Sequence, residues 1–343
     1  MSSRPTIKDI AAEAGVSTAT VDRVLNGRVQ VREETVRKVA NAAHRIGYHA
    51  TGLIDQRLVP TMPKMTFGFV LHKGKQEFYR NFAREIEQAV ANRRDIHGKA
   101  LVRFAADQSP ESFLQEIDAI SRGVDALASS AVNHQNINRE VQRLQGQGIP
   151  CFALLNDFAQ GVRANYLGLN NMQVGRIAAW LISHTQSEPG KVAVFVGGSR
   201  WHGHQLRETG FRSYLRESAP DFAVVDTLVN LETRTVTHEA TIDLLARHSD
   251  LRGIYVAGGG MEGAIAALRE VCPPGKVSLV VNELTEESRA GLVDGYVTMV
   301  IATPLAQLCA DLVEMMFNAV RTGSSETPGQ HFLEPTLYLP ESI

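Results

Sequence analysis

The sequence has few cysteines and no long apolar run, and each absence narrows the class of protein. Three cysteines are spread over 343 residues without a CxxC pair, so we expect neither a disulfide framework nor a redox or zinc centre. No apolar stretch approaches the roughly 20 residues that a membrane-spanning helix needs, and the N-terminus lacks a cationic, apolar leader. These features predict a cytoplasmic protein with no membrane partner.

Motifs for catalysis are also missing. The sequence contains no Gly-x-Ser-x-Gly elbow, no His-Glu-x-x-His and no P-loop. His202-Gly203-His204 is an isolated pair without a third ligand nearby, and this is a weak signal for metal. We therefore expect no catalytic residue, no metal site, no cofactor and no enzymatic activity.

The composition is that of an ordinary globular protein, with 44% hydrophobic and 21% charged residues. The length predicts two or three folded units. Residues 1–63 contain nine Lys/Arg and six Asp/Glu, a net charge of +3, and the remainder contains 26 and 31, a net charge of −5. The positive charge near the N-terminus suits contacts with phosphate groups.

The N-terminal 49 residues have the pattern of a helix-turn-helix. Gly15 permits a tight turn and Ser17 can cap the helix that follows, while Val21, Val24 and Leu25 recur at helical spacing. This spacing buries the apolar stripe and leaves four residues facing outward: Thr18, Ala19, Asp22 and Arg23. Small and hydrogen-bonding side chains beside an outward arginine suit a helix that reads base edges in the major groove.

The same residues resemble the LacI/GalR family of bacterial transcriptional repressors. The matching segments are Thr6-Ile7-Lys8-Asp9-Ile10-Ala11, Gly15-Val16-Ser17, Thr20-Val21, Arg23-Val24-Leu25-Asn26 and Gly47-Tyr48. The expected DNA-binding residues are Thr6, Ser17, Thr18, Ala19, Thr20, Asp22, Arg23, Asn26, Gln30 and Leu58. Because one head covers too little of the groove for specific binding, we expect a homodimer on an inverted-repeat operator in double-stranded DNA.

Residues 50–64 read as a linker because Gly52, Pro60 and Pro63 interrupt any long helix. In the resembling family this linker forms a hinge helix with an apolar wedge in the minor groove. Here Ala50-Thr51 replaces the usual Pro-Asn, and Leu58 lies one residue beyond the usual leucine position. Both a wedge formed by Leu58 and a merely flexible tether therefore stay open.

From Thr66 the chain alternates apolar, β-rich runs with helical stretches, which predicts an α/β fold with parallel sheets in two lobes. The pattern resembles the periplasmic-binding-protein-like core of the same family, and the resemblance places the lobe crossings near Arg163, Tyr296–Val300 and Gly323–Pro328. The predicted organisation is an all-α DNA-binding domain at 1–49, a hinge at 50–64 and a core at 65–343. Lobe 1 covers about 65–163 and 300–325, and lobe 2 covers about 164–299 and 326–343.

Polar and aromatic residues follow several predicted strands, at the edge where parallel α/β sheets bind ligands. The candidate effector-binding residues are Phe78, Tyr79, Asn156, Asp157, Asn171, Trp201, Arg207 and Glu283. The segment from Arg207 to Phe211 matches the family's Arg-x-x-Gly-Phe, whose arginine holds the effector. Glu283 falls where the family commonly has an Asp, and Gly258-Gly259 falls where it usually has Asn-Asp.

One motif points to another class of function. Residues Gly258 to Gly263 contain GxGxxG between a predicted strand and helix, and Glu283 follows about twenty residues later, as in a dinucleotide site. The alternative is thus an NAD(P)-dependent enzyme that carries a DNA-binding head. The motif comes late in the chain and no hydride-transfer residues accompany it, so we favour a turn that passes close to a ligand or a neighbouring helix.

These observations favour a DNA-binding regulator, in particular a repressor, whose effector binds between two lobes. Aromatic faces beside amide, guanidinium and carboxylate groups suit a sugar or a polyol. Because Glu283 replaces the family's Asp and glycines replace its Asn-Asp, a sugar acid, an opine or an amino-acid-like ligand stays open. The sequence does not identify the effector or the operator, and it leaves open whether the effector releases or promotes DNA binding.

Overall fold

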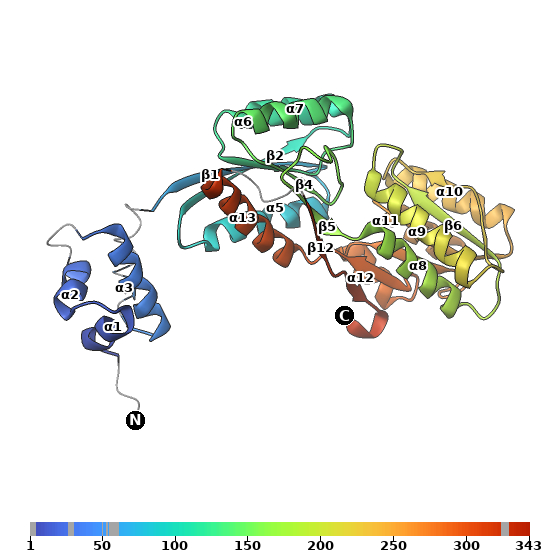
Figure 1. Cartoon of the computed structure of the whole chain (residues 1–343). Coiled ribbons are helices and arrows are strands. Elements are labelled where there is room, and N and C mark those ends of the chain that lie inside the picture. Colours follow the sequence, from blue (N-terminus) through green and yellow to red (C-terminus); the bar gives the residue numbers. More distant parts are fainter. Residues whose placement is uncertain (1–4, 27–30, 50, 53, 55–61, 324–328) are drawn as a thin grey trace. The chain divides into compact units, whose positions relative to one another are not determined.

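A computed structural model of the chain describes residues 5–26, 31–49, 51–52, 54, 62–323 and 329–343 (Figure 1). The chain divides into two compact units, Met1–Met65 with Ala91–Lys99 and Thr66–Val90 with Ala100–Ile343. One apolar cluster forms the core of the first unit, and two further clusters lie in the second. Among the described residues, no helix combines the length and the apolar character that a membrane span requires.

The first unit is a helix-turn-helix, as the sequence predicts. Its helices are α1 (Ile7–Ala14), α2 (Thr18–Asn26) and α3 (Glu33–Arg45). Gly15 takes a left-handed backbone with φ +66° between α1 and α2, and the Ser17 hydroxyl accepts the Thr20 amide at 3.1 Å. Ile10, Val21 and Val24 of the first two helices are buried together with residues of α3.

The linker is described only in part. Thr51, Gly52 and Ile54 are helical, and Ile54 is buried in the apolar cluster of the first unit. Two of the expected DNA-binding residues, Gln30 and Leu58, lie outside the described residues.

The first lobe, which lies almost entirely in the second unit, has a six-stranded sheet in the order β12-β5-β4-β3-β1-β2, and its pairs from β12 to β1 are parallel. Its strands are β1 (Lys64–His72), β2 (His97–Ala105), β3 (Ala126–Ser129), β4 (Cys151–Leu154), β5 (Asn165–Leu169) and β12 (Gly329–Leu333). Helices α6 (Pro110–Ser121) and α7 (Gln135–Gly146) cover one face, and α5 (Glu77–Asn92) and α13 (Leu305–Thr322) cover the other (Figure 1). The central strands are buried on both faces and are therefore almost entirely apolar.

The second lobe is built on a sheet in the order β13-β11-β10-β9-β6-β7, with β8 also paired to β6. Its strands are β6 (Lys191–Val196), β7 (Ala223–Val224), β8 (Leu228–Val229), β9 (Leu251–Val256), β10 (Ser278–Asn282), β11 (Met299–Ala302) and β13 (Thr336–Tyr338). Helices α8 (Asn171–Thr185) and α9 (His202–Ser218) pack together, as do α10 (Arg234–Arg247), α11 (Met261–Val271) and α12 (Glu286–Val293). A 3₁₀ turn, Pro340–Ser342, follows β13. Strand β13 is antiparallel to β11, an exception to the expected parallel pairing.

The chain crosses between the lobes later than the sequence suggests. Strand β5 still pairs in the first sheet, so the first crossing follows Leu169 rather than lying near Arg163. Strand β11 belongs to the second sheet and β12 to the first, which moves the other crossings past Ala302 and past Leu333. Short apolar strands look alike in sequence whichever sheet they join, and pairing alone decides where each one belongs.

Candidate functional site

The outward face of α2 consists of the residues that the sequence predicts to be exposed. Thr18, Ala19, Asp22, Arg23 and Asn26 are exposed. The amide of Asn26 donates to the Asp22 carboxylate at 2.7 Å, which fixes that carboxylate one turn from the end of the helix. An exposed arginine beside a fixed carboxylate offers donors and an acceptor to base edges.

Three of the expected DNA-binding residues also hold the head together. The Thr6 amide and hydroxyl both donate to Asp9 at 2.7 Å at the start of α1. The hydroxyls of Ser17 and Thr20 lie 2.8 Å apart at the start of α2. These side chains cap helices, so their substitution would change the helix ends as well as any contact with DNA.

A cavity of about 590 Å³ lies in the second unit, where strand ends of both sheets meet. Seven of the eight candidate effector-binding residues line it: Phe78, Tyr79, Asn156, Asn171, Trp201, Arg207 and Glu283. They come from both lobes, and their positions follow from the rule that ligands bind beyond the carboxyl ends of parallel strands. The volume suits a small molecule.

Asp157 is the exception, and its assignment to the cavity is wrong. Its carboxylate pairs with the Arg163 guanidinium at 2.5 and 2.9 Å, and both side chains are buried. Gln330 of β12 donates to the same carboxylate at 3.0 Å. Asp157 therefore links the segment between β4 and β5 to β12. Removing either partner of this buried ion pair would leave an uncompensated charge.

Arg207 is positioned by a close contact between α8 and α9. A Cβ on Gly175 would lie 1.9 Å from the Arg207 carbonyl oxygen, and one on Gly210 would lie 2.1 Å from the Met172 carbonyl oxygen. The Arg207 guanidinium donates to Asn171 Oδ1 at 2.7 Å and to the Ala257 carbonyl at 2.8 Å. The glycine of the Arg-x-x-Gly-Phe motif thus lets the backbones touch, and the arginine follows that geometry into the cavity.

Glu283 presents a buried carboxylate from the end of β10. Its backbone is left-handed, with φ +71°, and the Thr303 amide and hydroxyl donate to it at 2.9 and 2.7 Å. Burial raises the pKa of Glu283, although the Thr303 hydrogen bonds and the charge of Arg207 oppose the shift. The cavity therefore holds one fixed guanidinium and one fixed carboxylate that can take hydroxyl groups of a ligand.

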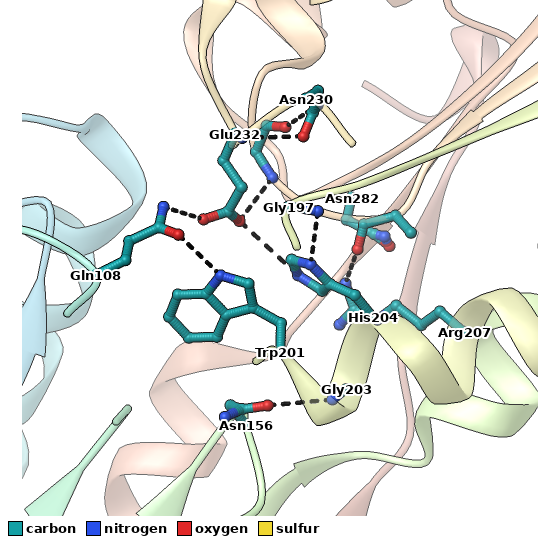
Figure 2. A network of polar contacts seen from close by, with 12 residues as sticks. Gln108, Asn156, Gly197, Trp201, Gly203, His204, Arg207, Asn230, Glu232 and Asn282 are labelled. Atoms are coloured by element: carbon teal, nitrogen blue, oxygen red, sulfur yellow. Dashed lines mark hydrogen bonds and ion pairs between the residues drawn. The ribbon is translucent and has the colours of Figure 1, made fainter. Parts of the chain in front are cut away.

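No motif in the sequence points to Glu232, and His204 is not among the candidate effector-binding residues. Figure 2 shows both side chains at the centre of a polar network, with Glu232 coming from the loop after β8 and His204 from the first turn of α9. Glu232 Oε1 accepts the Gly259 amide at 3.0 Å, and His204 Nδ1 accepts the Gly197 amide at 3.1 Å. His72 lies at the end of β1, with its Nε2 atom 4.0 Å from Glu232 Oε2.

The glycines 258 and 259 explain why these side chains fit. A Cβ on Gly258 would lie 2.3 Å from His204 Cε1, and a Cβ on Gly259 would lie 3.0 Å from Glu232 Cβ. The glycine-rich turn packs against protein side chains, as the simpler interpretation of the motif expects.

Among the described residues, no group of three or more His, Cys, Asp or Glu could hold a metal ion.

Burial and charge set the protonation of this network. Burial lowers the pKa of His204 to about 4, although the Glu232 charge opposes the shift. Burial also lowers the pKa of His72. Burial alone would raise the pKa of Glu232, but the contacts with His72 and Lys73 and the nearby His204 hold it well below its usual value. Glu232 is thus charged at neutral pH, and both histidines are neutral.

Two family descriptions match the chain. The description "Bacterial regulatory proteins, lacI family" matches residues 6–51, and "Periplasmic binding protein domain" matches residues 67–324. Reg1 of Streptomyces lividans, an HTH-type transcriptional regulator, is 27% identical over 78% of this chain and 70% of its own length. GalS of Salmonella typhimurium is 23% identical over 98% and 96%. The ribose operon repressor of Bacillus subtilis is 25% identical over 65% and 64%.

Solved structures share the fold of the second unit. An ABC transporter solute-binding protein from Agrobacterium vitis, bound with alpha-D-tagatopyranose, has a TM-score of 0.73 at 20% identity, covering 81% of this chain and 95% of its own. A periplasmic solute-binding protein from Actinobacillus succinogenes with bound D-allose has a TM-score of 0.74 at 17% identity, covering 81% and 98%. At this level of identity the similarity establishes the two-lobed fold.

Proposed function

Because this chain belongs to the LacI/GalR family of bacterial transcriptional regulators, we propose that it represses transcription in the cytoplasm and that a neutral sugar or polyol, bound between its lobes, controls operator binding. The relatives are regulators, and none of the family evidence supports an NAD(P)-dependent enzyme. The observation that carries the proposal is the cavity, in which seven side chains from both lobes converge.

The charge of the cavity favours a neutral ligand. Six carboxylates line it: Glu77, Glu232, Glu262, Glu283, Glu286 and Glu287. The lining cations are Lys75 and Arg207. Glu232 and Glu287 are already paired with cations outside the lining, Lys73 and Arg269, so four carboxylates remain against two cations. A sugar acid would bring another negative charge toward this surface, whereas a neutral polyol can accept from Arg207 and donate to Glu283. Trp201 and Phe78 add aromatic faces on which the C–H groups of a sugar ring can pack.

Thermal shift and calorimetry with matched ligands test the effector class. The probes are neutral pentoses, hexoses and polyols, each beside its acid, for example D-galactose with D-galacturonate and D-glucose with D-gluconate. We expect a neutral member to raise the melting temperature more than its acid, and we expect NAD⁺ to leave it unchanged. Saturable binding of NAD⁺, or preference for acids throughout, would contradict the proposal.

The head provides a second test. One recognition helix covers a single half-site, so we propose that two chains bind an inverted repeat as a homodimer. Selection from random fragments followed by sequencing identifies the operator, and sedimentation of the complex gives its stoichiometry. We expect two chains for each operator, and a single chain on the selected DNA would refute this part of the proposal.

A further inference from the structure

The Glu232 carboxylate joins the two lobes. Glu232 belongs to lobe 2, and its Oε2 atom accepts the Lys73 ammonium of lobe 1 at 2.7 Å. Gln108, which follows β2 in lobe 1, donates to the same oxygen at 3.0 Å. The Glu232 side chain is 8% exposed and that of Lys73 is 17% exposed, so water screens the pair only weakly.

The backbone on both sides is shaped for this contact. Leu231 and Glu232 have φ +50° and +53°, and Lys73 has φ +52°, a left-handed conformation that costs energy in residues other than glycine. Asn230 holds the loop, because its Oδ1 accepts the Glu232 amide at 2.9 Å and its Nδ2 donates to the Gly259 carbonyl at 2.9 Å. Asn230 is itself 1% exposed. A left-handed backbone at such residues persists only when the surrounding structure stabilises it. The fold itself therefore directs the Glu232 carboxylate toward lobe 1.

A second link lies beside the first. The indole of Trp201 in lobe 2 donates to Gln108 Oε1 at 2.9 Å, so Gln108 bridges Trp201 and Glu232 (Figure 2). His72 of lobe 1 stacks on Trp201 with ring centroids 4.8 Å apart. Every one of these contacts needs both lobes, and opening the cleft would break them together.

We propose that Lys73 and Glu232, with Gln108 as their bridge to Trp201, form a latch that closes the two lobes without any effector. Because these contacts exist only when the lobes are closed, their free energy shifts the population toward the closed conformation. The effector then binds a conformation that is already favoured. Glu232 and Trp201 line the cavity, whereas Lys73 does not belong to its described lining, so the latch borders the space that a ligand would occupy. The stronger the latch, the less the effector must prefer the closed conformation over the open one in order to close the lobes.

Trp201 provides a direct readout in the ligand-free protein. The chain has two tryptophans, and Trp180 is 47% exposed on α8, whereas Trp201 is 5% exposed within the latch. Trp180→Phe leaves Trp201 as the single tryptophan, and selective excitation of tryptophan separates its emission from that of the tyrosines. We expect its emission to be blue-shifted and poorly quenched by acrylamide, and we expect Glu232→Gln and Lys73→Met to increase the quenching constant at least twofold with a red shift.

Controls separate opening from misfolding. Glu217→Gln removes an ion pair of similar length, to Arg176, that lies within lobe 2 and should leave the quenching unchanged. Thermal melts and circular dichroism identify folded variants, and the exchange Lys73→Glu with Glu232→Lys should restore part of the protection that either charge reversal alone removes. An exposed Trp201 in the parent protein, or folded Glu232→Gln and Lys73→Met variants with unchanged quenching, would overturn the latch. The test uses no sugar, so its outcome is independent of the effector class proposed above.

Discussion

Removing the Arg207 guanidinium should separate effector binding from DNA binding. Arg207→Ala deletes the donors to Asn171 and to the Ala257 carbonyl, at 2.7 and 2.8 Å. Because Asn171 lines the cavity, water can take up its freed acceptor, and we expect a loss of only about 1–2 kcal/mol in the free energy of unfolding. One charge-assisted bond to a ligand oxygen contributes about 1.5–3 kcal/mol, so effector affinity should fall roughly 10- to 150-fold.

Fluorescence anisotropy with labelled operator measures both properties of this variant. In a repressor released by its effector, Arg207→Ala should hold the operator with unchanged affinity and need a correspondingly higher effector concentration for release. Arg216→Ala is the matched control, since Arg216 is exposed in the last turn of the same helix, α9. A folded Arg207→Ala protein that responds at the concentration of the parent protein would show that the effector does not contact this residue.

Three further predictions concern the reading helix and the buried histidine. Arg23→Ala should weaken cognate binding by about 1–3 kcal/mol and relax the preference at one base pair, and equal loss on all sequences in a competition assay would instead indicate a phosphate contact. Asp22→Ser removes a carboxylate that Asn26 holds at 2.7 Å. This variant should bind mixed DNA more tightly and show a smaller ratio of cognate to random affinity. An unchanged ratio over operator variants would contradict the role of Asp22 in specificity. The pKa of His204 is about 4 in the folded protein and about 6.5 in an unfolded chain. As the pH falls, the unfolded state takes up the proton first. The free energy of unfolding should therefore fall between pH 6.5 and 4, by up to about 3 kcal/mol. Denaturation of the core should show a shallower pH slope in His204→Gln, and an identical slope would assign the effect to other groups.

The sequence predicts the head and the strand-to-helix alternation well because both depend on local spacing. The apolar positions 21 and 24 follow the helical period and are buried in the structure. Strand ends in a parallel sheet share one edge, so Arg207 and Glu283 could be placed in one cavity from their positions after strands. The helix α12 and the strands β12 and β13 do not appear in the sequence interpretation because short segments near crossings have little periodicity of their own.

The residues that were missed or misplaced depend on contacts between distant segments. Asp157 follows a strand like its neighbour Asn156, but Arg163 and Gln330 bind its carboxylate away from the cavity. Glu232 lies in a loop without a motif, and its place becomes visible only when two glycines from another strand end leave room for it. Gly258-Gly259 is a sequence feature that could have indicated this contact. Two residues without side chains at the end of a strand, at the edge of the sheet where ligands bind, require a side chain from another segment to fill the space.

The packing of Gly258 against His204 couples three positions that lie far apart in the chain. A side chain at position 258 would collide with the His204 ring and with Glu232 Oε1, which lie 2.3 and 2.9 Å from a Cβ there. The cleft could therefore accept an asparagine at position 258 only together with smaller residues at 204 and 232, and the asparagine alone would overpack it. A single substitution borrowed from a relative would therefore be a poor guide to what this cleft can accept.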